Sequence, residues 1–199
     1  MTDATLTTTP AARGMPALRT GTLLAAFAVA VALRVAIGGV GVAQSARAGW
    51  VFAGCLLLLS FAAGTRLGLT RRSIRIGLVG AAVICAPVLL RQLLSARPPH
   101  SAAGFSSWVV VVVVVATAEE LFLRGSLYDA VTDLAGTPAA VAVGAVCFAA
   151  LHVPLYGWHV LPLDMAVGVV LGGLRQLSGT PAAPAVAHVS ADVAGWFFR

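Results

Sequence analysis

The chain contains no lysine and no asparagine, and glutamate occurs only twice, at Glu119 and Glu120. Charged residues make up 10% of its 199 residues, whereas 59% are hydrophobic, and the mean hydropathy is +0.95. A soluble domain needs more surface charge than this composition provides. The composition therefore excludes an ordinary soluble protein and predicts an integral membrane protein that passes through the lipid bilayer several times.

The scarcity of cysteine argues against a cysteine-ligated metal protein, and the placement of the arginines argues against a nucleic-acid-binding protein. Cys55, Cys85 and Cys147 lie in apolar stretches, are odd in number and lack the spacing of a metal site, so we expect small core residues. The net charge of +6 rests on arginines that gather in a few connecting segments. These arginines indicate topology signals and headgroup contacts, and we expect no nucleic-acid partner.

Long apolar runs predict an all-α, polytopic bundle of about seven transmembrane helices. Each run is close to the length of about 20 residues that a helix needs to cross the hydrocarbon core. One run contains seven consecutive valines, which would favour a strand in water, but in lipid only a helix satisfies the backbone of a lone segment. The expected spans are residues 21–43, 50–69, 75–94, 105–127, 138–156, 160–176 and 181–198.

These spans divide the chain into three regions. Residues 1–19 are rich in Thr, Ala and Pro and are predicted to form a disordered N-terminal tail. Residues 20–104 are expected to hold three N-terminal transmembrane helices that carry no motif. Residues 105–199 are expected to form a catalytic four-helix core, because the polar motifs described below fall within them.

The placement of arginine predicts the orientation of the chain. Arg34 lies inside the first apolar run, which is also longer than a signal peptide requires, so we expect an uncleaved helix. The connection between the second and third spans is the most basic one, with Arg66, Arg71, Arg72 and Arg75. The positive-inside rule then places the N-terminus in the cytoplasm and the C-terminus outside, in the plasma (inner) membrane.

The two glutamates give the strongest indication of function. Carboxylates are costly where water is scarce, so two of them at the end of the valine run mark a functional site. Glu120 precedes Arg124 by four residues, so the two side chains can pair on one face of a helix. Glu119 is rotated from Glu120 by about 100° around that helix. We therefore expect Arg124 to hold Glu120, and Glu119 to be free to act as a base.

Two histidines in later spans are expected to join the glutamates. His152 follows Phe148 by four residues in the fifth span, and His188 precedes Asp192 by four residues in the seventh. A lone histidine near a helix end is more often structural, but ionisable groups inside the membrane are functional by default. The helical rise places these groups at overlapping depths. We expect one polar cavity that lies within the membrane and opens toward the cytoplasm.

These residues resemble three motifs of a known family. In order, the chain contains Glu119-Glu120-Leu-Phe-Leu-Arg124, then Phe148-Ala-Ala-Leu-His152, then His188-Val-Ser-Ala-Asp192. The three patterns resemble those of the CAAX-protease and bacteriocin-processing family of intramembrane proteases, which includes the type II CAAX prenyl endopeptidases. The first pattern alone is weak, but three patterns in order, each in a separate apolar span, are specific. The resemblance covers about residues 105–198.

The resemblance implies an intramembrane endopeptidase that hydrolyses a peptide bond in a membrane-associated peptide or protein. It implies that Glu119 is the general base that activates water, and that Glu120 and Arg124 support the helix and its charge. His152 is implied to position or polarise that water.

The last motif departs from the family pattern. The resemblance places His188 and Asp192 where the family stabilises the oxyanion, but asparagine usually stands at the second position. An ionised Asp192 would repel a developing oxyanion, so activity requires a protonated Asp192 that donates its hydrogen, or an Asp192 that orients His188. The departure keeps open a catalytically inactive relative that acts as a membrane scaffold or immunity-type protein. A proton-coupled transporter is a third alternative, but the chain lacks the pseudo-repeated halves usual in transporters.

The histidines and glutamates leave both a glutamate mechanism and a metalloprotease mechanism open. Two histidines and a glutamate would make a three-ligand zinc site with a position for water. The same side chains can instead act directly as base and donors, and the sequence has no helical His-Glu-x-x-His motif. We expect that no cofactor is required, with divalent zinc as the alternative. No feature of the sequence defines the oligomeric state.

Overall fold

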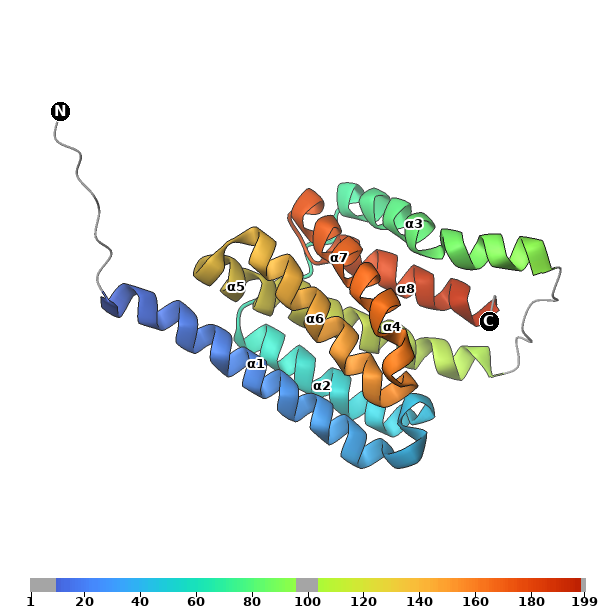
Figure 1. Cartoon of the computed structure of the whole chain (residues 1–199), viewed down its shortest axis with the longest axis horizontal. Helices are drawn as coiled ribbons and strands as arrows, with labels where there is room; N and C mark the ends of the chain where they lie inside the picture. Colours follow the sequence, from blue (N-terminus) through green and yellow to red (C-terminus); the bar gives the residue numbers. More distant parts are fainter. Residues whose placement is uncertain (1–9, 96–103, 198–199) are drawn as a thin grey trace.

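All regular secondary structure in the described part of the chain is helical. The computed structural model describes residues 10–95 and 104–197, and no strand is present among them, which confirms the all-α prediction. α4, the π-helix η2 and α5 follow one another without a break and form one long helix (Figure 1). The helices in chain order are α1 (Pro10–Gly38), η1 (Gly39–Gln44), α2 (Ala46–Ala62), α3 (Arg71–Ser95), α4 (Phe105–Leu121), η2 (Phe122–Ser126), α5 (Leu127–Ala135), α6 (Thr137–Tyr156), η3 (Trp158–Val160), α7 (Leu161–Ser178) and α8 (Ala182–Phe197).

Most of these helices have the length and composition of membrane spans. α2 has 17 residues and α8 has 16, so at about 1.5 Å per residue each reaches about 25 Å, slightly less than the hydrocarbon core. Each of the seven predicted spans therefore corresponds to a helix, and five of them have full spanning length. The five stretches that are long and apolar enough to cross a membrane are Met15–Gln44, Arg71–Leu94, Phe105–Ala135, Thr137–Tyr156 and Trp158–Ser178.

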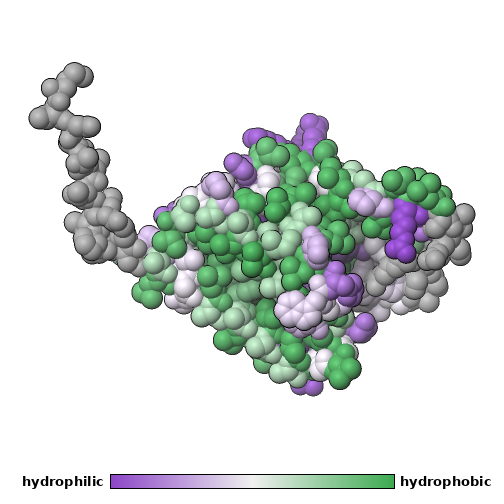
Figure 2. All heavy atoms as spheres, in the orientation of Figure 1, coloured by the Kyte–Doolittle hydropathy of each residue, from purple (hydrophilic) through white to green (hydrophobic). Residues whose placement is uncertain are grey.

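The surface and the interior have the polarity of a protein that is solvated by lipid. Large apolar side chains such as Leu58, Val79 and Leu93 are mostly exposed, and apolar residues cover most of the face shown in Figure 2. Glu120 and Arg124, by contrast, are fully buried. Lipid tails solvate apolar groups and exclude charged ones, so this distribution is the one expected of an integral membrane protein.

The first helix begins earlier than the sequence predicts. α1 starts at Pro10, so residues 10–19, assigned to a disordered tail, are helical, whereas residues 1–9 lie outside the described part of the chain. An ion pair holds this end of α1 against α5, since Arg19 Nη1 lies 3.3 Å from Asp133 Oδ2. Hydropathy does not reveal the extension, because polar residues and prolines occupy it and the contact with α5 is a tertiary one.

The N-terminal helices flank the motif-bearing helices on two sides. α1 packs against α2 and α5, and α2 packs against α4, whereas α3 packs against α7 and α8 (Figure 1). Glycine permits close approach of neighbouring helices. Between α7 and α6, a Cβ at Gly168 would lie 2.7 Å from the Ala145 Cα, and between α3 and α8, a Cβ at Gly77 would lie 2.6 Å from the Ala183 carbonyl oxygen. Small residues are the usual means by which membrane helices approach closely. The motifs are therefore enclosed by the first three helices.

Candidate active site

The helix that carries the two glutamates changes its winding directly after them. α4 ends at Leu121, and Phe122–Ser126 form the π-helix η2, which contains Arg124. Such single π-helical turns inside longer helices are rare and occur frequently at functional sites. Glu119 is 2% exposed and Glu120 is 0% exposed, so both carboxylates lie in the interior of the bundle.

Glu120 is held by two partners on one of its oxygens. Arg124 Nη1 lies 3.0 Å from Glu120 Oε1, and His188 Nδ1 lies 2.9 Å from the same oxygen. The pair of Glu120 and Arg124 expected from their spacing is therefore formed. The second oxygen, Oε2, is buried and has no hydrogen-bond partner in the described part of the chain. Glu120 thus joins η2 to α8 and is enclosed by its partners.

Arg124 connects η2 to two further helices. Its Nη2 donates to the Gly168 carbonyl oxygen of α7 at 3.1 Å, and its guanidinium lies 4.9 Å from the centre of the Phe148 ring of α6. Removing a buried guanidinium from water is costly unless its donors find acceptors. Because Arg124 contacts Glu120 as well, its charge is compensated within the bundle, and the arrangement is that of a structural support.

Glu119 faces a different part of the bundle, as its rotation from Glu120 predicts. Its Oε1 lies 3.3 Å from Nη1 of Arg34, which comes from α1. The Arg34 guanidinium also lies 4.6 Å from the centre of the Phe52 ring of α2. The expectation that Glu119 is free of an ion pair is therefore wrong. The available signal was Arg34 itself, the one charged residue in the first predicted span, because an arginine inside the membrane requires a partner.

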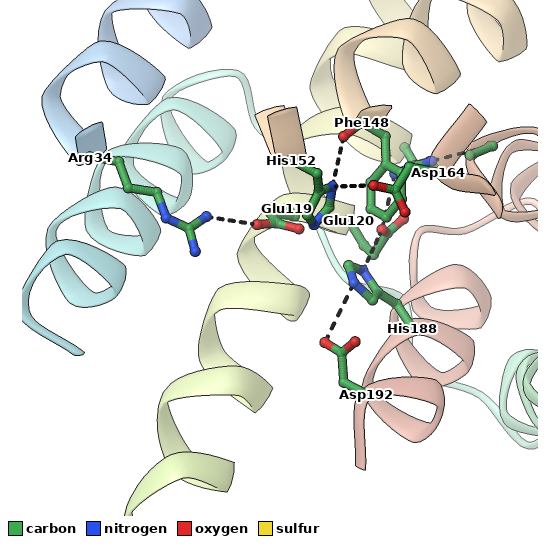
Figure 3. Close-up of polar contacts among 10 residues, drawn as sticks. Arg34, Glu119, Glu120, Phe148, His152, Asp164, His188 and Asp192 are labelled. Atoms are coloured by element: carbon green, nitrogen blue, oxygen red, sulfur yellow. Dashed lines mark hydrogen bonds and ion pairs between the residues drawn. The ribbon is translucent and has the colours of Figure 1, made fainter. Parts of the chain in front are cut away.

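In the view of Figure 3, His152 and Arg34 are drawn on opposite sides of Glu119. Its Nδ1 lies 2.8 Å from the Phe148 carbonyl oxygen and 3.8 Å from Oδ2 of Asp164, near the start of α7. A carbonyl oxygen only accepts, so Nδ1 carries the hydrogen, and Nε2 of the neutral ring is left as an acceptor. Asp164 was missed in the sequence, although a lone carboxylate in the sixth span is the same kind of signal as the glutamates.

His188 lies between two carboxylates. Glu120 contacts its Nδ1, and Asp192 Oδ2 lies 3.5 Å from its Nε2. The ring also packs edge-on against Phe148, with ring centres 5.2 Å apart. Partners on both ring nitrogens restrict rotation of the imidazole. The contact with Asp192 fits the second of the two roles expected for that residue, the orientation of His188.

The structure brings all of the sequence-predicted residues into one cluster and adds two more. Glu119 and Glu120 lie at its centre, and the other side chains come from α1, η2, α6, α7 and α8 (Figure 3). The predicted members are Glu119, Glu120, Arg124, His152, His188 and Asp192, and the added members are Arg34 and Asp164.

Three members of the cluster lie close to one end of the bundle. Arg34 is about one turn before the end of α1, His152 is about one turn before the end of α6, and Asp164 lies in the first turn of α7. The nearby connections are η1 and η3, and η1 contacts α6. If the N-terminus is cytoplasmic, both connections are external. A cytoplasmic N-terminus and a cavity that opens to the cytoplasm therefore do not fit together in this fold.

An apolar groove lies beside the cluster, between α1 and α6. Its volume is about 680 Å³, and it extends along α1 from Leu24 to Ala36. Along α6 it extends from Val146 to Pro154 and so passes the position of His152. Further lining residues are Phe27, Ala28, Val31, Ala32, Val35, Cys147, Ala150 and Leu151.

The polar side chains do not form a metal-binding set. Within residues 10–95 and 104–197, no group of three or more His, Cys, Asp or Glu side chains is arranged to hold a metal ion. The histidines and Glu119 are instead engaged by other partners: Nδ1 of His152 by a backbone carbonyl, His188 by two carboxylates, and Glu119 by Arg34. In the described structure these donors are therefore occupied by protein partners.

The fold and the cluster define a class, that of polytopic helical membrane proteins with acid–base groups buried in the bundle. Residues 101–194 match a family model described as type II CAAX prenyl endopeptidase Rce1-like, which confirms the resemblance drawn from the motifs. At the family level the match is to a CAAX-type intramembrane protease. Searches of curated proteins and of solved structures gave no match.

Proposed function

We propose that the chain is an intramembrane endopeptidase that hydrolyses a peptide bond of a membrane-associated substrate with water activated by Glu119. One observation carries the proposal: of the two buried glutamates, Glu120 is enclosed by Arg124 and His188, whereas Glu119 is contacted by Arg34 on Oε1 and points to the same part of the cluster as His152 in the view of Figure 3. A general base needs access to the proton that it removes. Glu119 and His152 meet that requirement, and Glu120 does not.

In the proposed reaction, a water molecule between Glu119 and His152 attacks the carbonyl carbon of the scissile peptide bond. Nε2 of His152 accepts one hydrogen bond from this water and so aligns it, because Nδ1 is committed to the Phe148 carbonyl. Glu119 takes the proton as the new C–O bond forms. It then delivers this proton to the amide nitrogen, the C–N bond breaks, and an acid and an amine are released.

His188 is proposed to stabilise the oxyanion that forms during this attack. An oxyanion requires a hydrogen-bond donor that is already in place when charge develops. Nδ1 of His188 is committed to Glu120, so the proposed donor is the Nε2–H, which lies 3.5 Å from Asp192 Oδ2. Asp192 then serves mainly to orient His188. We propose that the reaction needs no tightly held metal, in keeping with the donor set described above.

The apolar groove between α1 and α6 is proposed to hold the apolar part of the substrate. A membrane-associated substrate presents apolar surface, and the groove is lined almost wholly by apolar side chains. Its lining residues Val35 and Leu151 are the sequence neighbours of Arg34 and His152, so we propose that a substrate in the groove extends from there toward the cluster. The family description is consistent with this proposal, since it describes prenyl endopeptidases.

A second candidate function rests on Asp192. The family pattern usually has asparagine at this position, so an inactive relative that serves as a membrane scaffold or immunity-type protein would retain the fold and lose the donor. The cluster is nevertheless complete in its other members, since Glu119, Glu120, Arg124, His152 and His188 each have a polar partner within it. This completeness favours the endopeptidase over the scaffold.

Cleavage of a membrane peptide by the purified protein in liposomes tests the proposal. We expect hydrolysis by the wild type, before and after prolonged chelation, and none by Glu119→Gln, whose thermal unfolding temperature should stay near that of the wild type. Glu120→Gln should lower that temperature, because it weakens the contacts of buried Arg124 and His188. Hydrolysis by Glu119→Gln at the wild-type rate, or loss of activity on chelation with recovery on adding zinc, would contradict the mechanism.

A further inference from the structure

Arg34 lies outside the family-matched segment, yet it reaches the centre of the cluster. The matched segment begins at residue 101, whereas Arg34 comes from α1. Its side chain is 10% exposed, and it pairs with Glu119, whose side chain is 3% exposed. An arginine inside an apolar helix is costly, and such residues are usually retained for a function. The question is what this arginine does for the carboxylate that it contacts.

The contacts of Arg34 differ from those of Arg124, the other buried arginine of the cluster. Arg124 uses both terminal nitrogens, on Glu120 and on the Gly168 carbonyl oxygen. Arg34 contacts Glu119 through Nη1 alone, and its Nε is buried without a hydrogen-bond partner in the described part of the chain. A purely structural pair is expected to satisfy more of its donors. The single contact therefore points to a role centred on Glu119.

The position of the contact on Glu119 indicates that role. Arg34 engages Oε1, and Figure 3 draws Arg34 and His152 on opposite sides of Glu119. One carboxylate oxygen is thus fixed from the α1 side. A carboxylate restrained in this way keeps one orientation for proton transfer, and small misplacements of a catalytic group have large effects on rate.

We propose that Arg34 is a positioning residue of the active centre, which holds the Glu119 carboxylate in one orientation for proton transfer. The proposal rests on the proposed function, in which Glu119 is the general base. It makes α1 a part of the active centre, although the family motifs lie wholly in the later helices. Phe52 supports the guanidinium from α2, so the contact depends on the packing of both N-terminal helices.

Variants of Arg34 in the full-length protein in liposomes test the proposal by kinetics. Arg34→Gln should lower kcat by about 10²-fold with little change in KM, because Glu119 loses its orientation while the groove is untouched. Arg34→Lys should recover part of kcat, since it retains the charge. Arg19→Gln is the matched control: Arg19 also lies on α1 and pairs with a carboxylate, Asp133, but that pair is exposed and remote from the motifs.

A second measurement does not depend on cleavage. A carbodiimide that reacts with carboxyl groups should label Glu119 several-fold more in Arg34→Gln than in the wild type, because the guanidinium no longer occupies Oε1 of Glu119. Arg19→Gln should show no increase. The other charged or titratable neighbours stay unchanged in all of these variants. They are Glu120 on α4, Arg124 on η2, His152 on α6, Asp164 on α7 and His188 on α8.

The two readouts separate the possible failures. If the wild type cleaves and Arg34→Gln retains its kcat, or loses it only in proportion to the folded fraction, the positioning role is overturned. If the wild type cleaves none of the membrane peptides, the proposed function fails. In that case, unchanged labelling of Glu119 in Arg34→Gln overturns the link between the two side chains, and increased labelling supports it.

Discussion

Glu119 and Glu120 are neighbours in the sequence but belong to two separate ion-pair networks. Glu120 joins Arg124 and His188, and Glu119 joins Arg34. The separation follows from helix geometry, because adjacent residues point about 100° apart. One turn of helix can therefore combine a carboxylate that stabilises the bundle with a carboxylate proposed to carry out chemistry, and each is compensated by its own arginine.

Asp192 is the member of the cluster for which chemistry and family pattern disagree, and its substitution gives a residue-scale prediction. The side chain is 39% exposed and lies 3.5 Å from His188 Nε2. Because Asp192 is proposed to orient His188, Asp192→Asn should lower activity. If Asp192 acts instead as a protonated donor, Asn supplies an amide that needs no protonation, so the variant should keep activity and extend it toward alkaline pH. Asp192→Ala should lose about 10² to 10³ in rate in that case.

Rates of peptide cleavage measured from acidic to alkaline pH distinguish the two roles of Asp192. If Asn is as inactive as Ala, the donor role is wrong and a carboxylate that orients His188 accounts for the loss. Full activity in both variants would place Asp192 outside the site. Thermal unfolding of each variant serves as the control for folding.

The close packing of α6 against α7 supports the site at the scale of the helix. Gly168 allows this approach, since a Cβ there would lie 2.7 Å from the Ala145 Cα and 3.2 Å from the Ala145 carbonyl oxygen. The same glycine offers its carbonyl oxygen to Arg124. Separation of the two helices would therefore loosen Arg124 and, through it, Glu120.

Gly168→Ala should consequently destabilise the fold by about 1–3 kcal/mol, the usual cost of overpacking, and should also lower activity. Gly173→Ala is the matched control: it lies on the same helix, and its Cβ would meet no atom within 4 Å. Thermal unfolding of both variants in detergent checks the prediction. Equal stability of Gly168→Ala and Gly173→Ala would show that α6 and α7 can separate without cost.

The sequence predicts elements better than it predicts their tertiary contacts. Apolar run length located all seven long helices, and the spacing of Glu120 and Arg124 predicted their pair, because both signals are local. The pairing of Glu119 with Arg34 joins residues that are 85 positions apart, and no local pattern connects them. The helical start of α1 was missed for the same reason, since Arg19 is held by Asp133 of α5.

At the scale of the whole molecule, the N-terminal helices are part of the site and not only a membrane anchor. α1 supplies Arg34, and α2 supplies the Phe52 ring beneath it. α3 lies on the other side of the bundle, against α7 and α8. The motif-bearing helices are thus held between two groups of N-terminal helices, and family motifs alone describe only part of the active centre.

The orientation of the bundle decides which face of the membrane the site serves. Arg66, Arg71 and Arg72 lie in or beside the connection from α2 to α3, and the positive-inside rule places this connection in the cytoplasm. η1 and η3, the connections near Arg34 and His152, would then be external. The site would in that case be reached from the external side or from the lipid.

Reporter fusions measure this orientation. A fusion after Arg72 should score cytoplasmic, and a fusion after Gly157, in the connection from α6 to η3, should score external, because one helix crossing separates successive connections. A fusion after Arg97, which lies outside the described residues, should also score external. The reverse pattern would overturn the predicted orientation, place η1 and η3 in the cytoplasm, and restore a cavity nearer the cytoplasmic face. Fusions after Arg72 and Gly157 that score on the same side would instead contradict the number of spans between them.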